Sequence, residues 1–166
     1  MVPFELRPWH IDDLPSLVRH ANDPGIADNL TDTFPHPYTE ESGRRFIGLF
    51  GDERPVRVQC IVVNGEAAGS IGLYPQSDIM RRNAELGYWL ARPHWGRGIV
   101  TEAVRRMVDH GFEHFPITRI FARPFGSNLA SQRVLEKAGF TLEARLIGTI
   151  EKNGRIEDEL IYAVRR

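Results

Sequence analysis

The chain has 166 residues, of which 42% are hydrophobic and 26% charged, with a net charge of −1. We therefore expect one folded domain over residues 1–166, and neither nucleic acid nor a membrane surface as a partner. No apolar run reaches the roughly 20 residues of a membrane-spanning helix, and no signal-peptide pattern opens the chain. With one cysteine, Cys60, the sequence predicts a soluble, cytoplasmic protein without disulfides or a cysteine-rich metal site.

Helices and strands are expected to alternate along the chain. The apolar patterns predict strands at 4–7, 56–63, 67–74, 85–90, 119–123, 141–150 and 155–164, and helices at about 12–21, 39–50, 99–112 and 128–139. Asp12 and Thr39 are the expected caps of the first two helices, and residues 22–38 look turn-rich. Asn64-Gly65 is a strong hairpin signal. The fold class is therefore mixed α/β, with helices interrupting one largely antiparallel sheet.

A glycine-bearing loop connects the strand at 85–90 to the helix that follows. It reads Trp95-Gly96-Arg97-Gly98 and continues as Ile99-Val100-Thr101-Glu102. Glycines allow the backbone to approach a ligand, and a helix start adds free N–H donors and the positive end of the dipole. Together they predict a site for phosphate or pyrophosphate, with the Arg97 side chain and the Thr101 hydroxyl as further contacts. The alternative is that Gly96 and Gly98 only shape a tight turn.

Two other phosphate-binding patterns do not fit this loop. A P-loop requires a lysine after its last glycine, and none is present. A Rossmann fingerprint requires a third glycine, but Thr101 stands at that position. It also requires an acidic residue about 20 positions further on, where the chain has Thr118 and Arg119 instead.

Two motifs in the order and spacing of one family carry a resemblance. The first is Ala84-Glu85-Leu86-Gly87-Tyr88-Trp89-Leu90 with the glycine loop and Thr101-Glu102-Ala103; the second is Asn128-Leu129-Ala130-Ser131 with residues 134–140. Over nearly its whole length the chain resembles the GNAT superfamily of N-acetyltransferases, and in particular the RimJ/RimL branch that acetylates ribosomal protein N-termini. The resemblance implies the GNAT fold, in which two central parallel strands splay apart within a mixed, largely antiparallel sheet with about four helices.

The resemblance implies acetyl-CoA as cosubstrate, bound in the cleft between the splayed strands. Its pyrophosphate would be held by the backbone amides of Arg97, Gly98, Ile99, Val100 and Thr101, with Gly96 shaping the turn. The superfamily pattern Q/R-x-x-G-x-G/A is broken at Trp95 and Val100, as is common in the RimJ/RimL branch. No metal is implied.

The resemblance also implies direct attack of an amine on the thioester, for which Glu85 is the expected base. Strand alternation places Glu85 on one face with Gly87 and Trp89. A base is useful because an amine must be neutral to attack. The alternative is a solvated carboxylate paired with Arg81 or Arg82.

The departing thiolate needs a proton donor, and the sequence lacks the usual one. Leu135 stands where much of the superfamily has a tyrosine, so Ser131 is the RimL-like candidate, with a helix cap or a solvent contact as its alternative. Asn128 is expected to cap its helix and to contact the amide arm of the cofactor. Cys60 lies in an apolar strand, so an acetyl-cysteine intermediate is not expected.

The acceptor is expected between residues 22–38 and 147–159, which wall the amine side of the cleft in this family. Glu151, Glu157, Asp158 and Glu159 would attract a cationic acceptor. A protein N-terminus, a lysine, a polyamine or an amino sugar fits this outline, which also leaves room for a homodimer. The alternatives are a non-catalytic acyl-CoA sensor and a nucleotide-binding domain. The pattern His110-x-x-Glu113-His114 resembles a metal motif, but it lies on an apolar helix face without a further ligand.

Overall fold

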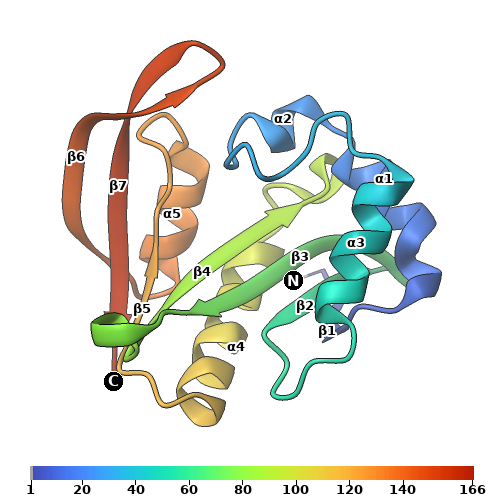
Figure 1. The fold of residues 1–166 in the computed structure, drawn as a ribbon, viewed down its shortest axis with the longest axis horizontal. Helices are drawn as coiled ribbons and strands as arrows, with labels where there is room; N and C mark the ends of the chain where they lie inside the picture. Colours follow the sequence, from blue (N-terminus) through green and yellow to red (C-terminus); the bar gives the residue numbers. More distant parts are fainter. Residues whose placement is uncertain (1) are drawn as a thin grey trace.

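The computed structural model describes residues 2–166, which form one seven-stranded sheet (Figure 1). The strands are β1 (Phe4–Pro8), β2 (Val58–Val63), β3 (Glu66–Pro75), β4 (Asn83–Leu90), β5 (Arg119–Ala122), β6 (Thr141–Lys152) and β7 (Arg155–Arg165). Their order is β1-β2-β3-β4-β5-β7-β6, and every neighbouring pair is antiparallel except β4 with β5. The mixed, largely antiparallel sheet is confirmed.

The central parallel pair separates soon after it forms. β4 and β5 are in register only at Asn83–Arg119, Ala84–Ile120 and Glu85–Phe121. Beyond Glu85, β4 runs on to Leu90 without β5 beside it, and the two strands diverge in Figure 1. The expected splay of two parallel strands is therefore confirmed, and Glu85 lies at its apex.

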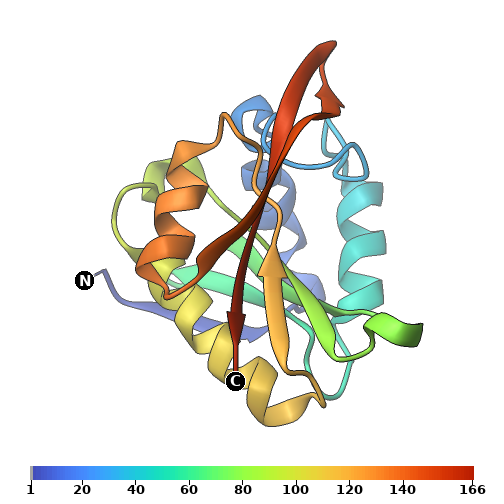
Figure 2. The ribbon, with the colours of Figure 1, turned by 90° about the vertical axis from the view of Figure 1, so that its left-hand side faces the viewer.

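Five α-helices cover the two faces of the sheet. They are α1 (Leu14–Ala21), α2 (Pro24–Ala27), α3 (Glu40–Phe50), α4 (Ile99–His114) and α5 (Leu129–Lys137). Figure 2 shows α3 on the opposite side of the sheet from α4 and α5. Short 3₁₀ turns occupy Ile11–Asp13, Asp78–Met80 and Arg92–His94. Within residues 2–166, none of the helices is both long and apolar enough to cross a membrane.

The local signals that start helices and turns are mostly confirmed. The Thr39 side chain accepts the Ser42 amide (3.2 Å), and Asn64 and Gly65 turn with φ of 53° and 79°. Asp12 as the first cap is wrong: His10 caps a 3₁₀ turn and α1 begins only at Leu14. The cause is Asp13, whose carboxylate accepts the His10 amide and two Arg7 nitrogens, which holds the chain in this tighter turn.

Residues 22–38 contain a helix that the turn-rich reading missed. The Asp23 side chain accepts the Gly25 amide (2.8 Å), and Pro24 takes the first position of α2, where it lacks no helical hydrogen bond. The tip of the β6–β7 hairpin reaches this segment: Lys152 Nζ lies 2.7 Å from Asp32 Oδ1, and Asn153 Nδ2 donates to Asp28 Oδ1 (2.9 Å). The two segments expected to wall the acceptor side therefore meet.

β4 contributes to two separate cores. Leu86 and Leu90 pack with α4 and α5, whereas Trp89 packs with α1 and α3. Odd-numbered and even-numbered residues of β4 therefore face opposite sides of the sheet, which confirms the expected alternation.

Candidate active site

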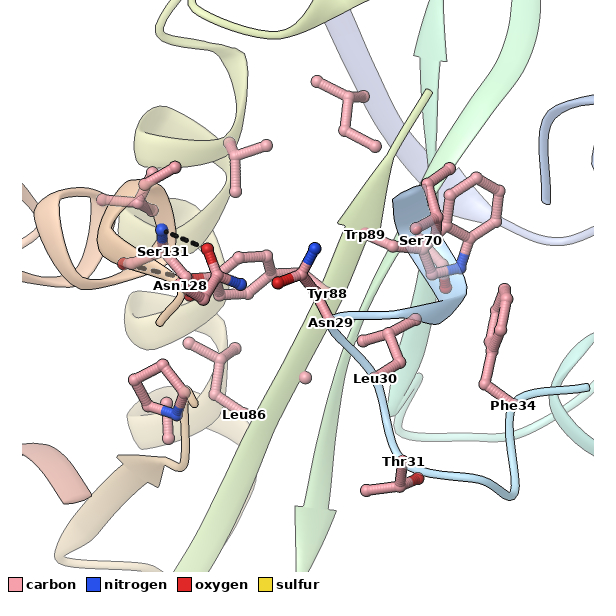
Figure 3. Close-up of a pocket in the computed structure, with 18 of the residues that line it drawn as sticks. Asn29, Leu30, Thr31, Phe34, Ser70, Leu86, Tyr88, Trp89, Asn128 and Ser131 are labelled. Carbon is pink, nitrogen blue, oxygen red and sulfur yellow. Dashed lines mark hydrogen bonds between the residues drawn. The ribbon is translucent and has the colours of Figure 1, made fainter. Parts of the chain in front are cut away.

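One cleft of about 1370 Å³ runs across β4 between its two covering layers. It is lined by every residue that the sequence analysis expected in catalysis or cofactor binding, namely Glu85, Gly96, Arg97, Gly98, Ile99, Val100, Thr101, Asn128 and Ser131. In Figure 3, Asn128 and Ser131 lie on one side of β4, and Phe34 and Trp89 lie on the other. The cleft is therefore one space with two halves, and Glu85 lies at the apex of the splay between them.

The glycine loop presents free backbone amides to the cleft. Gly96 and Gly98 have φ of 72° and 78°, and a Cβ at either would meet no atom within 4 Å. The Glu102 amide is the first to bond back along the helix, to the Gly98 carbonyl (3.2 Å). The amides of Ile99, Val100 and Thr101 come before that bond, so they have no acceptor within α4. Three donors at the positive end of a 16-residue helix suit an anion.

Trp95, a departure from the superfamily pattern, holds the loop in place. Its indole Nε1 donates to the Leu90 carbonyl (2.6 Å) at the end of β4. The Arg92 guanidinium lies 5.5 Å from the Trp95 ring centre, and Arg92 is itself paired with Asp23. Trp95 thus fixes the start of the loop to the strand that precedes it.

The amide edge of β4 faces the opening left by β5. The Ala91 amide donates to Ala68 and the Gln76 amide donates to Asn83, so hydrogen-bonded pairs fall on the odd-numbered residues of β4. Because these pairs alternate along an antiparallel ladder, Leu86 and Tyr88 direct their N–H and C=O groups away from β3. An extended ligand in the splay would find a strand edge to pair with.

Glu85 is half-buried and has no ion-pair partner among residues 2–166. The alternative pairing is not found: Arg81 donates to the Asp78 carbonyl (3.0 Å), and neither Arg81 nor Arg82 binds Glu85. Burial raises the pKa of Glu85 above its ordinary value, the positive charge of Arg123 opposes this, and the negative charge of Glu159 adds to it. A carboxylate with a raised pKa is better matched to accept an amine proton.

Ser131 has a partner that the sequence reading missed. The Tyr88 hydroxyl lies 2.7 Å from Ser131 Oγ, and the hydrogen bond is visible in Figure 3. Burial raises the pKa of Tyr88 to about 12, although the Ser131 hydrogen bond lowers it. The phenol therefore stays protonated at working pH and can donate to Ser131 Oγ, which leaves the serine proton free to be given away. The signal available in sequence was Tyr88 on the even-numbered face of β4.

Asn128 caps α5, as expected. Its Oδ1 accepts the Ser131 amide (3.1 Å). No hydrogen bond within residues 2–166 occupies its Nδ2 group, which remains a donor beside the cleft.

The acidic wall expected from the closing hairpin is wrong. Glu159 is buried against Arg123, Asp158 binds Arg145 (2.6 Å) and the Gly148 amide (2.9 Å), and Glu157 accepts the Ser127 hydroxyl. Glu151, the fourth carboxylate, is exposed, and none of the four lines the cleft. The number of carboxylates in the hairpin can be counted in the sequence, whereas the partner of each carboxylate depends on the fold.

The remaining reactive side chains are engaged elsewhere. His110 Nε2 lies 2.7 Å from the Val56 carbonyl, and His114 Nδ1 lies 3.0 Å from the His110 carbonyl. Within residues 2–166, no group of three His, Cys, Asp or Glu side chains is placed to hold a metal ion. Cys60 is buried, which raises the pKa of its thiol to about 12 and makes it a poor nucleophile.

A splayed parallel pair that leads into an amide-rich helix start is an arrangement suited to a phosphorylated ligand along a strand edge. The family model described as "Acetyltransferase (GNAT) domain" matches residues 4–141. The chain therefore belongs to the GNAT acetyltransferase family, and the resemblance drawn from the two motifs is confirmed.

Two curated relatives are similar to the chain. "Probable N-acetyltransferase YjcK" of Bacillus subtilis is 40% identical over 96 residues, which are 58% of this chain and about half (53%) of that protein. "Uncharacterized N-acetyltransferase p20" of Bacillus licheniformis is 29% identical over 96% of this chain and 90% of that one.

Solved structures with bound coenzyme A have the same fold. The ribosomal-protein acetyltransferase RimL in complex with coenzyme A has a TM-score of 0.84 at 22% identity, over 99% of this chain and 97% of that one. Mycobacterium smegmatis RimJ in complex with a coenzyme A disulfide has a TM-score of 0.80 at 27% identity, over 98% and 81%. The likeness to RimL shows the shared fold, and the likeness to RimJ at 27% identity supports the RimJ/RimL branch.

Proposed function

We propose that the protein transfers the acetyl group of acetyl-CoA to a primary amine within a ternary complex. The observation that carries the proposal is the continuity of the cleft, which joins the free amides of the glycine loop, the open edge of β4 and an unpaired carboxylate. Coenzyme A bound to RimL and RimJ supports the choice of cosubstrate.

Each feature of the cleft has a place in this reaction. The amides of Ile99, Val100 and Thr101 bind the diphosphate, and the edge of β4 at Leu86 and Tyr88 pairs with the extended arm of the cosubstrate. An amide of that edge also stabilises the oxyanion of the tetrahedral intermediate. Asn128 Nδ2 donates to an amide carbonyl of the arm.

The proton moves from the amine to Glu85, and the departing thiolate takes a proton from Ser131; Ser131 then regains a proton from solvent, and Glu85 releases its proton there. The amine nitrogen attacks the acetyl carbonyl carbon, the carbon–sulfur bond breaks, and the products are an acetamide and coenzyme A. Tyr88 acts as a positioning residue: its hydroxyl lies 2.7 Å from Ser131 Oγ, and a hydrogen bond donated by the phenol directs the serine proton to the thiolate.

Incubation with acetyl-CoA and a panel of primary amines tests the proposal through release of free thiol. Release that depends on an amine supports it, and no release with any peptide or small amine contradicts it. A thermal shift separates the alternatives, because a ligand at 100 times its Kd stabilises the folded state by about 2.7 kcal/mol. Acetyl-CoA should raise Tm where ATP and NAD do not. A rise in Tm with acetyl-CoA but no turnover would favour a non-catalytic acyl-CoA sensor. Equal rises in Tm with acetyl-CoA, ATP and NAD would favour a general nucleotide-binding site.

Replacing Ser131 with alanine is expected to lower kcat by about 10-fold, because water replaces the donor with poorer orientation. Tyr88→Phe should cause a smaller loss, and it should cause none in a Ser131→Ala background, since the tyrosine acts through the serine. Ser127→Ala is the matched control, because Ser127 lines the same cleft but donates to Glu157. Additive losses for Tyr88 and Ser131 in steady-state kinetics would contradict this proton path.

A further inference from the structure

The half of the cleft on the α3 side of β4 is lined by apolar and aromatic side chains. They come from α3, from the segment after α2, from β3 and from β4: Phe34, Phe46, Leu49, Phe50, Tyr74 and Trp89. Ring centres of Phe46 and Phe50 lie 5.2 Å apart, those of Phe50 and Tyr74 lie 6.3 Å apart, and those of Phe34 and Trp89 lie 6.1 Å apart. Two clusters of aromatic side chains, Phe34 with Trp89 and Phe46 with Phe50 and Tyr74, therefore line one recess. Figure 3 shows Phe34 and Trp89 within it.

Gly87 of β4 lines the floor of this recess without a side chain. Its partner on β3, Gly72, is buried beneath Tyr74 and Val58 and does not line the cleft, and the Tyr74 ring lies 3.4 Å from a Cβ at Gly87. Leu49 on the α3 wall is 60% exposed and Tyr74 is 38% exposed. Apolar surface that stays open inside a cleft is stabilised when an apolar ligand covers it.

The charges along the cleft disfavour an acceptor with several positive groups. Glu85 is the one carboxylate among the residues that line it, while the lining cations are Arg45, Arg97, Arg123, Arg133 and Lys137. The Arg45 guanidinium lies 3.5 Å from the Glu41 carboxylate, and Arg123 is paired with Glu159, although the Arg123 charge also acts on Glu85. One ammonium can lie at Glu85, whereas a second ammonium in the recess would meet an apolar wall and no further carboxylate of the lining.

We infer that the acceptor is a primary amine with one positive charge and an apolar or aromatic group within a few bonds of the nitrogen. This rests on the proposed acetyl transfer and narrows its substrate class. The nitrogen lies at Glu85, gives its proton there and forms the new bond to the acetyl carbon as the bond to sulfur breaks. The apolar group lies beside Gly87 and the Tyr74 ring, between α3 and Phe34. An arylalkylamine and a peptide N-terminus with an apolar first residue share this chemistry.

Initial rates of thiol release with matched amines test the inference. 2-Phenylethylamine should exceed ethylamine in kcat/KM by about 10- to 100-fold, the value of burying one aromatic ring. It should also exceed spermidine. A peptide with an amino-terminal phenylalanine, compared with the same peptide beginning with serine, shows whether the source is a small amine or a chain end. Higher kcat/KM for spermidine overturns the inference while acetyl transfer stands. No release with any amine removes both.

Two substitutions on α3 distinguish the effect of a charge inside the recess on kcat/KM from the effect of the same charge outside it. Leu49→Asp places a carboxylate in the recess and should lower kcat/KM for 2-phenylethylamine by about 10-fold while raising that for spermidine. Gly48→Asp adds the same charge one residue away, where a Cβ meets nothing within 4 Å and the side chain does not line the cleft. It should leave both rates unchanged. Equal effects of the two variants, or a loss for both amines in Leu49→Asp, overturn the inference.

Discussion

Replacing Glu85 with glutamine is expected to lower kcat/KM by about 100-fold near neutral pH, the lower range for loss of a general base. Glutamine keeps the size of the side chain and cannot take the amine proton. Glu85 has no ion pair or side-chain hydrogen bond among the described residues, so the substitution removes only its longer-range attraction to Arg123. Initial rates of thiol release across pH check the expectation.

The shape of the pH profile distinguishes a base from a merely polar group. The wild-type rate should fall as Glu85 becomes protonated, and because burial raises the pKa of Glu85, this acid limb should lie above the pH of an ordinary glutamate. Without the base, the rate follows the neutral fraction of the amine, so the deficit should shrink as pH approaches the pKa of the amine, about 7.7–8.0 for an α-amino group. Parallel profiles for the two proteins would remove Glu85 from this role.

Protein stability supplies the control for this substitution. A carboxyl whose pKa is raised in the folded state favours the protonated form, so its contribution to stability is lost as pH rises through that pKa. Glu85→Gln should therefore keep or raise Tm at pH 7 while it lowers activity. A lower Tm would assign the lost activity to damage of the fold.

Features of the site that depend on neighbouring residues along the chain could be predicted from the sequence. The amides at 99–101 follow from a glycine loop that opens a helix, and the Asn128 cap follows from its place before an amphipathic segment. The alternation that separates Trp89 from Leu86 is a property of any strand. These are the local parts of the cleft.

Features that depend on distant residues could not be predicted in this way. Tyr88 and Ser131 are 43 positions apart, and their contact depends on how α5 packs against β4. Neutralisation of Glu159 by Arg123 depends on the pairing of β5 with β7, and the place of the Tyr74 ring beside Gly87 depends on the register of β3 with β4. The sequence of the hairpin therefore predicts a site for cations, because the arginines that pair with its carboxylates are identified only by the fold.

Replacing Gly98 with alanine is expected to weaken acetyl-CoA binding by about 10- to 100-fold. A Cβ at Gly98 meets no atom within 4 Å, so the methyl group projects into open space at the start of α4. There it obstructs the approach of a diphosphate to the amides of Ile99 and Val100, and each lost hydrogen bond to a charged group is worth about 1.5–3 kcal/mol. Titration calorimetry with acetyl-CoA measures the change in Kd.

The same substitution at Gly65 separates binding from backbone strain. Gly65 has φ of 79° against 78° at Gly98, and its Cβ would also meet nothing within 4 Å, but it lies in the β2–β3 turn and does not line the cleft. Both alanines should lower Tm by a similar amount, since a left-handed conformation costs a non-glycine residue about 1–2 kcal/mol. Only Gly98→Ala should also lose the thermal shift given by acetyl-CoA. Equal shifts in the two variants would mean that the diphosphate does not lie at this helix start, because one methyl group there would then have obstructed nothing.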